Sequence, residues 1–159
     1  MPRLSNAHIQ PNKVASMLRT VLFTASMMMC GFSIGQALTL ADAKAKNAVQ
    51  LSASELRKLL PGATIVNQGP AGATRRWENN PSGNLAASTD GRGNTGGHAY
   101  PGSGSGSWKI DDKGMYCVAI KWPRVTEDWC RYVFKTGDRY YAFDTLDDTA
   151  RGSEFEISK

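Results

Sequence analysis

Cysteine and histidine are scarce in this chain of 159 residues. It has three cysteines and two histidines, and beyond residue 30 only Cys117, Cys130 and His98 remain. Two cysteines and one histidine cannot supply the four ligands of a structural zinc site. His98 lies in a glycine-rich stretch, a poor place to hold a general base within about 0.5 Å of a working geometry. We therefore expect no metal, no cofactor and no catalytic histidine.

Other signs of catalysis are also weak. The adjacent carboxylates at 127–128 and 147–148 fall where we expect such groups to be solvated. The segment 91–96 matches the pattern Gly-x-Gly-x-x-Gly, but 97–101 does not form the helix start that a dinucleotide site requires. We expect a protein without catalytic residues. A hydrolase of unrecognised type would need two acidic or hydroxyl side chains that converge in a pocket.

Neither sign of charge dominates the chain. There are 19 basic and 14 acidic residues, and removal of residues 1–43 would leave 16 basic and 13 acidic ones. The basic residues are interspersed with acidic ones, whereas nucleic-acid-binding proteins usually show a basic patch or stripe. We expect no nucleic-acid partner.

Long apolar runs are lacking except for one near the N-terminus, at residues 21–35. Three basic residues precede it: Arg3, Lys13 and Arg19. Small residues follow it at 35–37 and again at 41–43, a pattern typical of a secretory signal peptide. A membrane anchor would need about 20 apolar residues. We expect a signal peptide within residues 1–43, cleaved after Ala37 or Ala43. The mature protein would then be periplasmic or secreted, with only the uncleaved precursor in the membrane.

The two cysteines that remain after cleavage predict a disulfide. An even number of cysteines in an oxidising compartment is normally paired. Closing a loop of this length contributes about 3 kcal/mol in the chain-entropy model. If Cys117 and Cys130 lie directly opposite each other in a hairpin, two apolar faces result. One face carries Cys117, Ala119, Tyr132 and Phe134, and the other carries Tyr116, Val118, Ile120, Trp129 and Val133. Either face could form the core.

Runs of aromatic and β-branched residues alternate with turn signals along most of the chain. They predict a mainly β fold: an antiparallel meander of about seven to eight strands, closed or open as a small barrel. The expected strands are 63–67, 74–78, 84–89, 107–110, 115–122, 129–135, 139–144 and 154–158. The segment 51–159 would form a single domain. Its glycine-rich stretch, 90–106, contains seven glycines and predicts a flexible loop.

One short helix precedes the strands. Ser52 and Glu55 have the spacing of a capping box, and Leu51 and Leu56 that of a hydrophobic staple. Pro61-Gly62 would end the helix. The residues before it, 44–50, read as a flexible lead-in.

Three stretches, LSASELRKLLPGATIV, GSGSWKIDDKGMYCVAIKW and EDWCRYVFKTGDRYY, carry a resemblance to a family of small exported bacterial proteins, a domain of unknown function. The resemblance spans roughly residues 51–144. It implies a small antiparallel sheet or barrel preceded by one helix, and it brings no catalytic residues. The chain is also similar, more loosely, to lipocalin-like periplasmic inhibitors of hydrolases. That second likeness rests on architecture, which does not by itself imply function.

These observations favour an exported binding or inhibitor module whose partner is an envelope or secreted protein. Tyr100, Trp122 and Trp129 are candidate anchors on its surface, because large aromatic side chains carry much interface energy. Packing in the core is the alternative role for each of them. A carrier of a small apolar ligand is the other hypothesis, because an eight-stranded barrel can hold one small ligand. An open cavity would favour the carrier, and a filled interior would favour the inhibitor.

Overall fold

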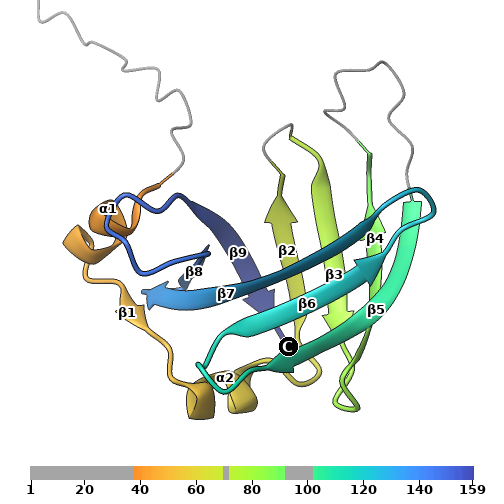
Figure 1. Ribbon diagram of the computed structural model, residues 1–159, viewed down its shortest axis with the longest axis horizontal. Helices are drawn as coiled ribbons and strands as arrows, with labels where there is room; N and C mark the ends of the chain where they lie inside the picture. The colour runs from red at the N-terminus through yellow and green to blue at the C-terminus, as the bar shows by residue number, and fades with distance from the viewer. Residues whose placement is uncertain (1–37, 70–71, 92–101) are drawn as a thin grey trace, which may run out of the picture. The chain divides into compact units, whose positions relative to one another are not determined.

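The computed structural model describes residues 38–69, 72–91 and 102–159 (Figure 1). These residues form two helices, α1 (Leu40–Ala45) and α2 (Ala53–Leu59). Their strands are β1 (Val49–Gln50), β2 (Thr64–Gln68), β3 (Thr74–Asn79), β4 (Asn84–Thr89), β5 (Gly102–Ile110), β6 (Tyr116–Lys121), β7 (Thr126–Thr136), β8 (Arg139–Phe143) and β9 (Gly152–Ser158). The apolar run at 21–35, His98 and Tyr100 lie outside the described residues. No helix among the residues that the structure describes is long and apolar enough to cross a membrane.

The strands close into an antiparallel barrel. The sheet runs in the order β1-β7-β6-β5-β4-β3-β2-β9-β8, and a further pairing of β7 with β8 joins its ends. Eight strands, β2 to β9, therefore form the barrel. The short strand β1 pairs with the end of β7, on the edge opposite β8. The predicted fold class is confirmed. All eight predicted strands are present, and β4 has the predicted bounds.

The register of β6 and β7 settles which face forms the core. Cys117 lies directly opposite Cys130, and Tyr116 opposite Arg131. The core cluster contains Tyr116, Val118, Ile120 and Val133, so this face points into the barrel. The disulfide face points outward. Phe134 on that outer face is nevertheless buried, because a second cluster built around α1 covers it.

The segment before the predicted helix is ordered, which corrects the expectation of a flexible lead-in over 44–50. Thr39 caps α1 in a capping box with Asp42, and the hydrogen bonds from Thr39 lower the pKa of the Asp42 carboxyl. Leu40 and Ala43 are fully buried in the outer cluster. Val49 and Gln50 then pair with Lys135 and Phe134. The sequence of this segment does not by itself predict that it is ordered. The surface against which it packs belongs to β7 and β8, about 90 residues further along the chain.

Helix α2 has the predicted start. The backbone N–H of Glu55 donates to Ser52 Oγ at 3.3 Å, and the backbone N–H of Ser52 donates to Glu55 Oε2 at 2.7 Å. The hydrogen bonds from Ser52 lower the pKa of the Glu55 carboxyl. Leu56 and Leu60 are fully buried in the barrel core. The helix therefore packs against one end of the barrel, below β5 and β6 in Figure 1.

Replacing Ser52 by Ala is expected to lower the free energy of unfolding by about 1 kcal/mol, because the first turn of α2 loses its side-chain acceptor. Urea denaturation measures this loss. Ser107→Ala is the matched control, because Ser107 is exposed on β5. Equal stability of the two variants would mean that the capping box does not stabilise the fold.

Strand β5 begins at Gly102, five residues before the predicted start, so 102–106 is strand and not loop. Gly104 and Gly106 alternate with exposed Ser103 and Ser105. A Cβ on Gly104 would lie 2.9 Å from side-chain atoms of both Ile120 and Trp122. A Cβ on Gly106 would overlap the backbone of Ala119. These glycines therefore permit a close approach of β5 to β6, a known use of glycine inside strands.

Candidate functional site

The barrel interior holds an aromatic cluster. Trp77 on β3 lies edge-on to Trp129 on β7, with ring centroids 6.1 Å apart, and edge-on to Phe155 on β9 at 5.7 Å. Trp129 also contacts Tyr116 edge-on at 5.7 Å, and Trp108 contacts Tyr116 at 6.3 Å. Edge-to-face packing at these distances is favourable for aromatic pairs. The rings join opposite walls of the barrel and occupy its centre.

A chain of hydrogen bonds runs beside these rings. Trp77 Nε1 donates to Tyr116 Oη at 2.8 Å, and Tyr116 Oη donates to Asn79 Oδ1 at 2.9 Å. Burial raises the pKa of the Tyr116 phenol, so the group remains a neutral donor. Asn79 is fully buried. These hydrogen bonds tie β3 to β6 inside the barrel, and Asn79 Nδ2 has no hydrogen-bond partner among the residues that the structure describes.

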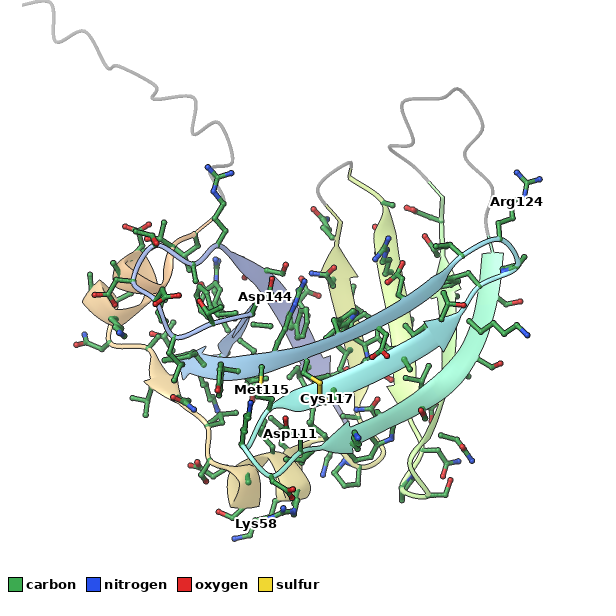
Figure 2. All side chains as sticks on the ribbon, viewed as in Figure 1. Lys58, Asp111, Met115, Cys117, Arg124 and Asp144 are labelled. Carbon is green, nitrogen blue, oxygen red and sulfur yellow. A yellow bond between two sulfur atoms is a disulfide. The ribbon has the colours of Figure 1, made fainter. Side chains whose placement is uncertain are left out.

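The inward face of the barrel also carries an ion pair. Arg75 Nη1 is 2.9 Å from Glu127 Oε2. Arg75 precedes Trp77 by two residues on β3, and Glu127 precedes Trp129 by two on β7, so both charged side chains share the inward face of the barrel. The pair joins opposite walls near the barrel end formed by the β6–β7 hairpin. Figure 2 shows Arg124 of that hairpin at this end and Lys58 of α2 at the other.

Arg131 lies just before the residues of β7 that pair with β8. Its guanidinium lies 5.0 Å from the centre of the Trp129 ring. Its Nη1 donates to Ser153 Oγ at 3.0 Å, and its Nε is 2.8 Å from Asp144 Oδ1 in an ion pair. These contacts connect β7 to β9 and to the segment after β8.

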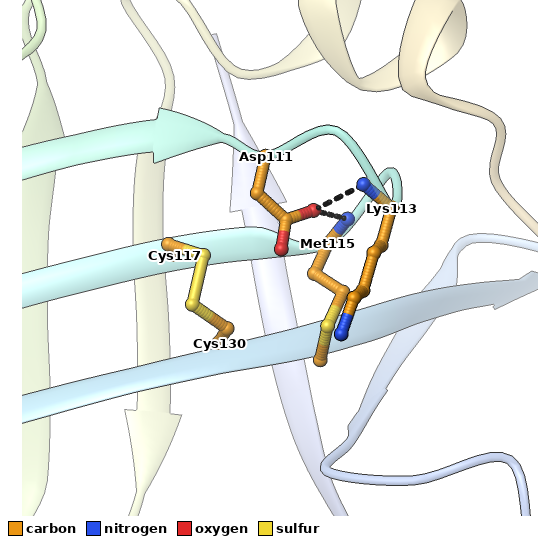
Figure 3. The surroundings of a disulfide bond; sticks show 5 residues. All are labelled: Asp111, Lys113, Met115, Cys117 and Cys130. Atoms are coloured by element: carbon orange, nitrogen blue, oxygen red, sulfur yellow. Dashed lines mark hydrogen bonds between the residues drawn. A yellow bond between two sulfur atoms is a disulfide. The ribbon is translucent and has the colours of Figure 1, made fainter.

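The predicted disulfide is present between Cys117 and Cys130. Asp111 lies beside it (Figure 3), and its Oδ1 accepts hydrogen bonds from the backbone N–H groups of Lys113 and Met115. Asp111 therefore holds the turn between β5 and β6. Its carboxylate and the two sulfur atoms lie within 4.8 Å of one another. Sulfur atoms joined in a disulfide are not thiolates, so this group does not form a metal site.

The structure places two of the three predicted surface anchors inside the barrel. Trp122 is only 8% exposed, and Trp129 packs against the core. Both are corrections to the view of exposed aromatic anchors. Trp129 lies directly opposite Val118, which belongs to the barrel core, so the Trp129 side chain points inward. The sequence alone left open which face of this hairpin points inward. Tyr100, the third, is outside the described residues.

The adjacent carboxylates do not converge. Glu127 points inward to Arg75, whereas Asp128 points outward and is exposed. Asp148 pairs with Lys44 at 2.7 Å, and Asp147 accepts a hydrogen bond from Thr145 at 2.9 Å. The inward charged residues Arg75, Glu127 and Arg131 were missed at the sequence level. Their alternation with Trp77, Trp129 and Val133 was the available signal.

No family model matches the chain, and neither a curated protein nor a solved structure matches it. The resemblance to the domain of unknown function and to periplasmic inhibitors therefore stays a prediction.

Proposed function

We propose that this chain is an exported, non-catalytic binding module that contacts, and in that way inhibits or sequesters, a protein of the cell envelope or the surrounding medium. The observation that carries the proposal is the aromatic cluster inside the barrel. Trp77, Tyr116, Trp129 and Phe155 pack against one another where a carried ligand would have to lie. Binding would then use the outer surface or the rim of the barrel. The disulfide is compatible with an oxidising compartment and supports export.

Export implies a processing point, and we propose that it follows Ala37. Leu38 and Thr39 pair with the start of β9: Leu38 O accepts from the backbone N–H of Gly152 at 2.8 Å, and Thr39 forms a bridge with Arg151. Cleavage after Ala43 would remove these contacts and cut α1 in its middle. A mature chain of residues 38–159 retains every described residue of the outer cluster.

The decisive experiment produces the full chain with a C-terminal tag in its native host, and isolates it from the envelope and from the medium. Native mass spectrometry then gives the mass of the mature chain and of anything bound to it. We expect a start at Leu38 and one stoichiometric protein partner. The same tag on an unrelated exported domain controls for adventitious capture.

Two results would overturn the proposal. A small molecule bound in place of a protein would favour the carrier, because the interior would then have to open. Retention of the chain in the cytoplasm, with its leader intact, would remove the export on which the binding role depends.

A further inference from the structure

Strand β7 is paired along only part of one edge. Its first half, Thr126 to Arg131, pairs with β6, and its second half, Tyr132 to Thr136, pairs with β8. β1 continues the β6 side by pairing with Phe134 and Lys135. On the β8 side, the first half of β7 has no strand partner among the residues that the structure describes. This edge runs from the β6–β7 hairpin toward β8 in Figure 1.

The geometry of the hairpin identifies the backbone groups at this edge. The backbone N–H of Trp122 donates to Val125 O at 2.9 Å, so 122 and 125 form a hydrogen-bonded pair. Hydrogen-bonded and non-hydrogen-bonded pairs alternate in an antiparallel ladder. Cys117 and Cys130, with Cα atoms 4.0 Å apart, then form a non-hydrogen-bonded pair, as that short distance requires. The N–H and C=O groups of Thr126, Asp128 and Cys130 therefore point away from β6.

The side chains along this edge are exposed or partly exposed, and they carry one outward-facing negative charge. Thr126 and Asp128 are exposed, and Cys130 is partly exposed. Asp128 lies opposite Ala119, a small neutral residue. Glu127 adds no charge here, because it points inward to Arg75. Arg131, bonded to Ser153 and paired with Asp144, marks where the free edge ends.

Sheet proteins usually protect such an edge with a charged side chain, a proline, a bulge, an inward-pointing charge or a covering segment. Between Thr126 and Cys130, the described part of this chain has no proline and no covering strand, and its protecting charges are both negative: Asp128 on the outer face and Glu127 pointing inward. Negative charges oppose an acidic strand and leave the edge open to a basic one. An exposed edge of this kind can accept an extended peptide as an additional strand.

We propose that the edge of β7 at Thr126–Cys130 binds an extended segment of the partner protein as an added strand, with a lysine or arginine of that segment beside Asp128. The proposal rests on the binding role proposed above and assigns its surface. A second copy of this chain is a poorer occupant. Symmetric antiparallel pairing about Asp128 would place two like charges directly opposite each other, which is destabilising.

The test uses the mature chain, 38–159, and a phage-displayed library of nine-residue peptides with randomised side chains. We expect the selected peptides to be enriched in basic residues. In a synthetic copy of the best peptide, N-methylation of every second amide should reduce affinity by at least tenfold, and methylation of the intervening amides should change it little. This alternation reports an added strand, because only every second amide faces β7.

Matched variants of the protein complete the test. Asp128→Lys should weaken peptide binding about tenfold, because an attraction becomes a repulsion. Asp112→Lys is the control, with the same charge change in the exposed turn between β5 and β6. Thermal unfolding of both variants checks that the fold is intact.

Several results would overturn the proposal: no peptide enriched, no alternation in the methylated series, or equal binding by Asp128→Lys and the unchanged chain. A dimer in which the amides of Thr126, Asp128 and Cys130 resist hydrogen exchange would assign the edge to a second copy instead. If Asp128→Lys still retains a partner from the native envelope, the edge is excluded while the proposed function stands.

Discussion

A chain that begins at Lys44 is expected to be less stable than one that begins at Leu38 by about 3 kcal/mol or more. The shorter chain lacks Leu40, which is fully buried against the outer face of the barrel. Loss of a buried leucine side chain alone typically costs about 2–5 kcal/mol. The shorter chain also lacks the hydrogen bond from Leu40 N–H to Ala150 O, 2.9 Å long. Urea denaturation of the two purified chains measures the difference.

The truncation should also expose apolar surface. Phe134, Tyr141 and Phe143 are buried beneath α1 in the intact chain, and Phe134 lies edge-on to Phe143 at 5.4 Å. Without α1 these rings would form an exposed patch, which should bind a hydrophobic dye and promote association. The full mature chain should bind little dye.

Point variants separate the contribution of Leu40 from that of chain length. Leu40→Ala should cost about 3 kcal/mol. Leu146→Ala makes the same chemical change at a side chain that is 47% exposed, and should stay within about 0.5 kcal/mol of the unchanged chain. If Leu40→Ala proves as stable as Leu146→Ala, α1 does not pack on the barrel, and the reason for placing the processing point after Ala37 disappears.

The second large effect is expected at Gly106. A Cβ added there would overlap the carbonyl oxygen of Ala119 and lie 2.8 Å from its carbonyl carbon. These are backbone atoms, which cannot move without displacing β5 from β6 in the register that pairs Gly106 with Ile120. Overpacking of this kind typically costs about 1–3 kcal/mol and at times more. We expect Gly106→Ala to lose about 3 kcal/mol in urea denaturation.

Two neighbours of Gly106 make the result specific. Ser105→Ala changes an exposed position on the same strand, and should alter stability by less than about 0.5 kcal/mol. Gly104→Ala should lie between the two, because its Cβ meets side-chain atoms of Ile120 and Trp122, which can shift. If Gly106→Ala is too unstable to purify, the contrast between Gly104 and Ser105 still tests the strand. Equal stability of all three variants would contradict the strand at 102–106 and support the loop that its composition suggests.

Much of the fold could be predicted because its signals are local. Alternating apolar residues and turn signals located all eight strands of the barrel, as in the match between 84–89 and β4. The capping box at Ser52 and Glu55 located the start of α2, because its two hydrogen bonds join residues three apart. The disulfide followed from there being only two cysteines beyond residue 30.

Composition misled at two places, and for the same reason. Glycine favours loops when nothing else is known, yet Gly104 and Gly106 lie in a strand because Ile120, Trp122 and Ala119 leave no room for a side chain. Residues 44–50 read as a flexible lead-in, yet Ala48 packs against the outer cluster and Val49–Gln50 pair with β7.

By itself, then, the sequence determined the β class, the order of the barrel strands, the first turn of α2 and the pairing of the cysteines. The first three depend on residues close together in the chain, and the last on there being only two cysteines beyond residue 30. Only the tertiary structure decided which face of the β6–β7 hairpin points inward, where Trp122 and Trp129 lie, and that Arg75 reaches Glu127 across the barrel. It also decided that, among the residues described, no strand pairs with the first half of β7 on the β8 side. Each of these depends on contacts between strands distant in the chain, and on the register in which they meet. A shift of one residue in that register would exchange the inner and outer faces.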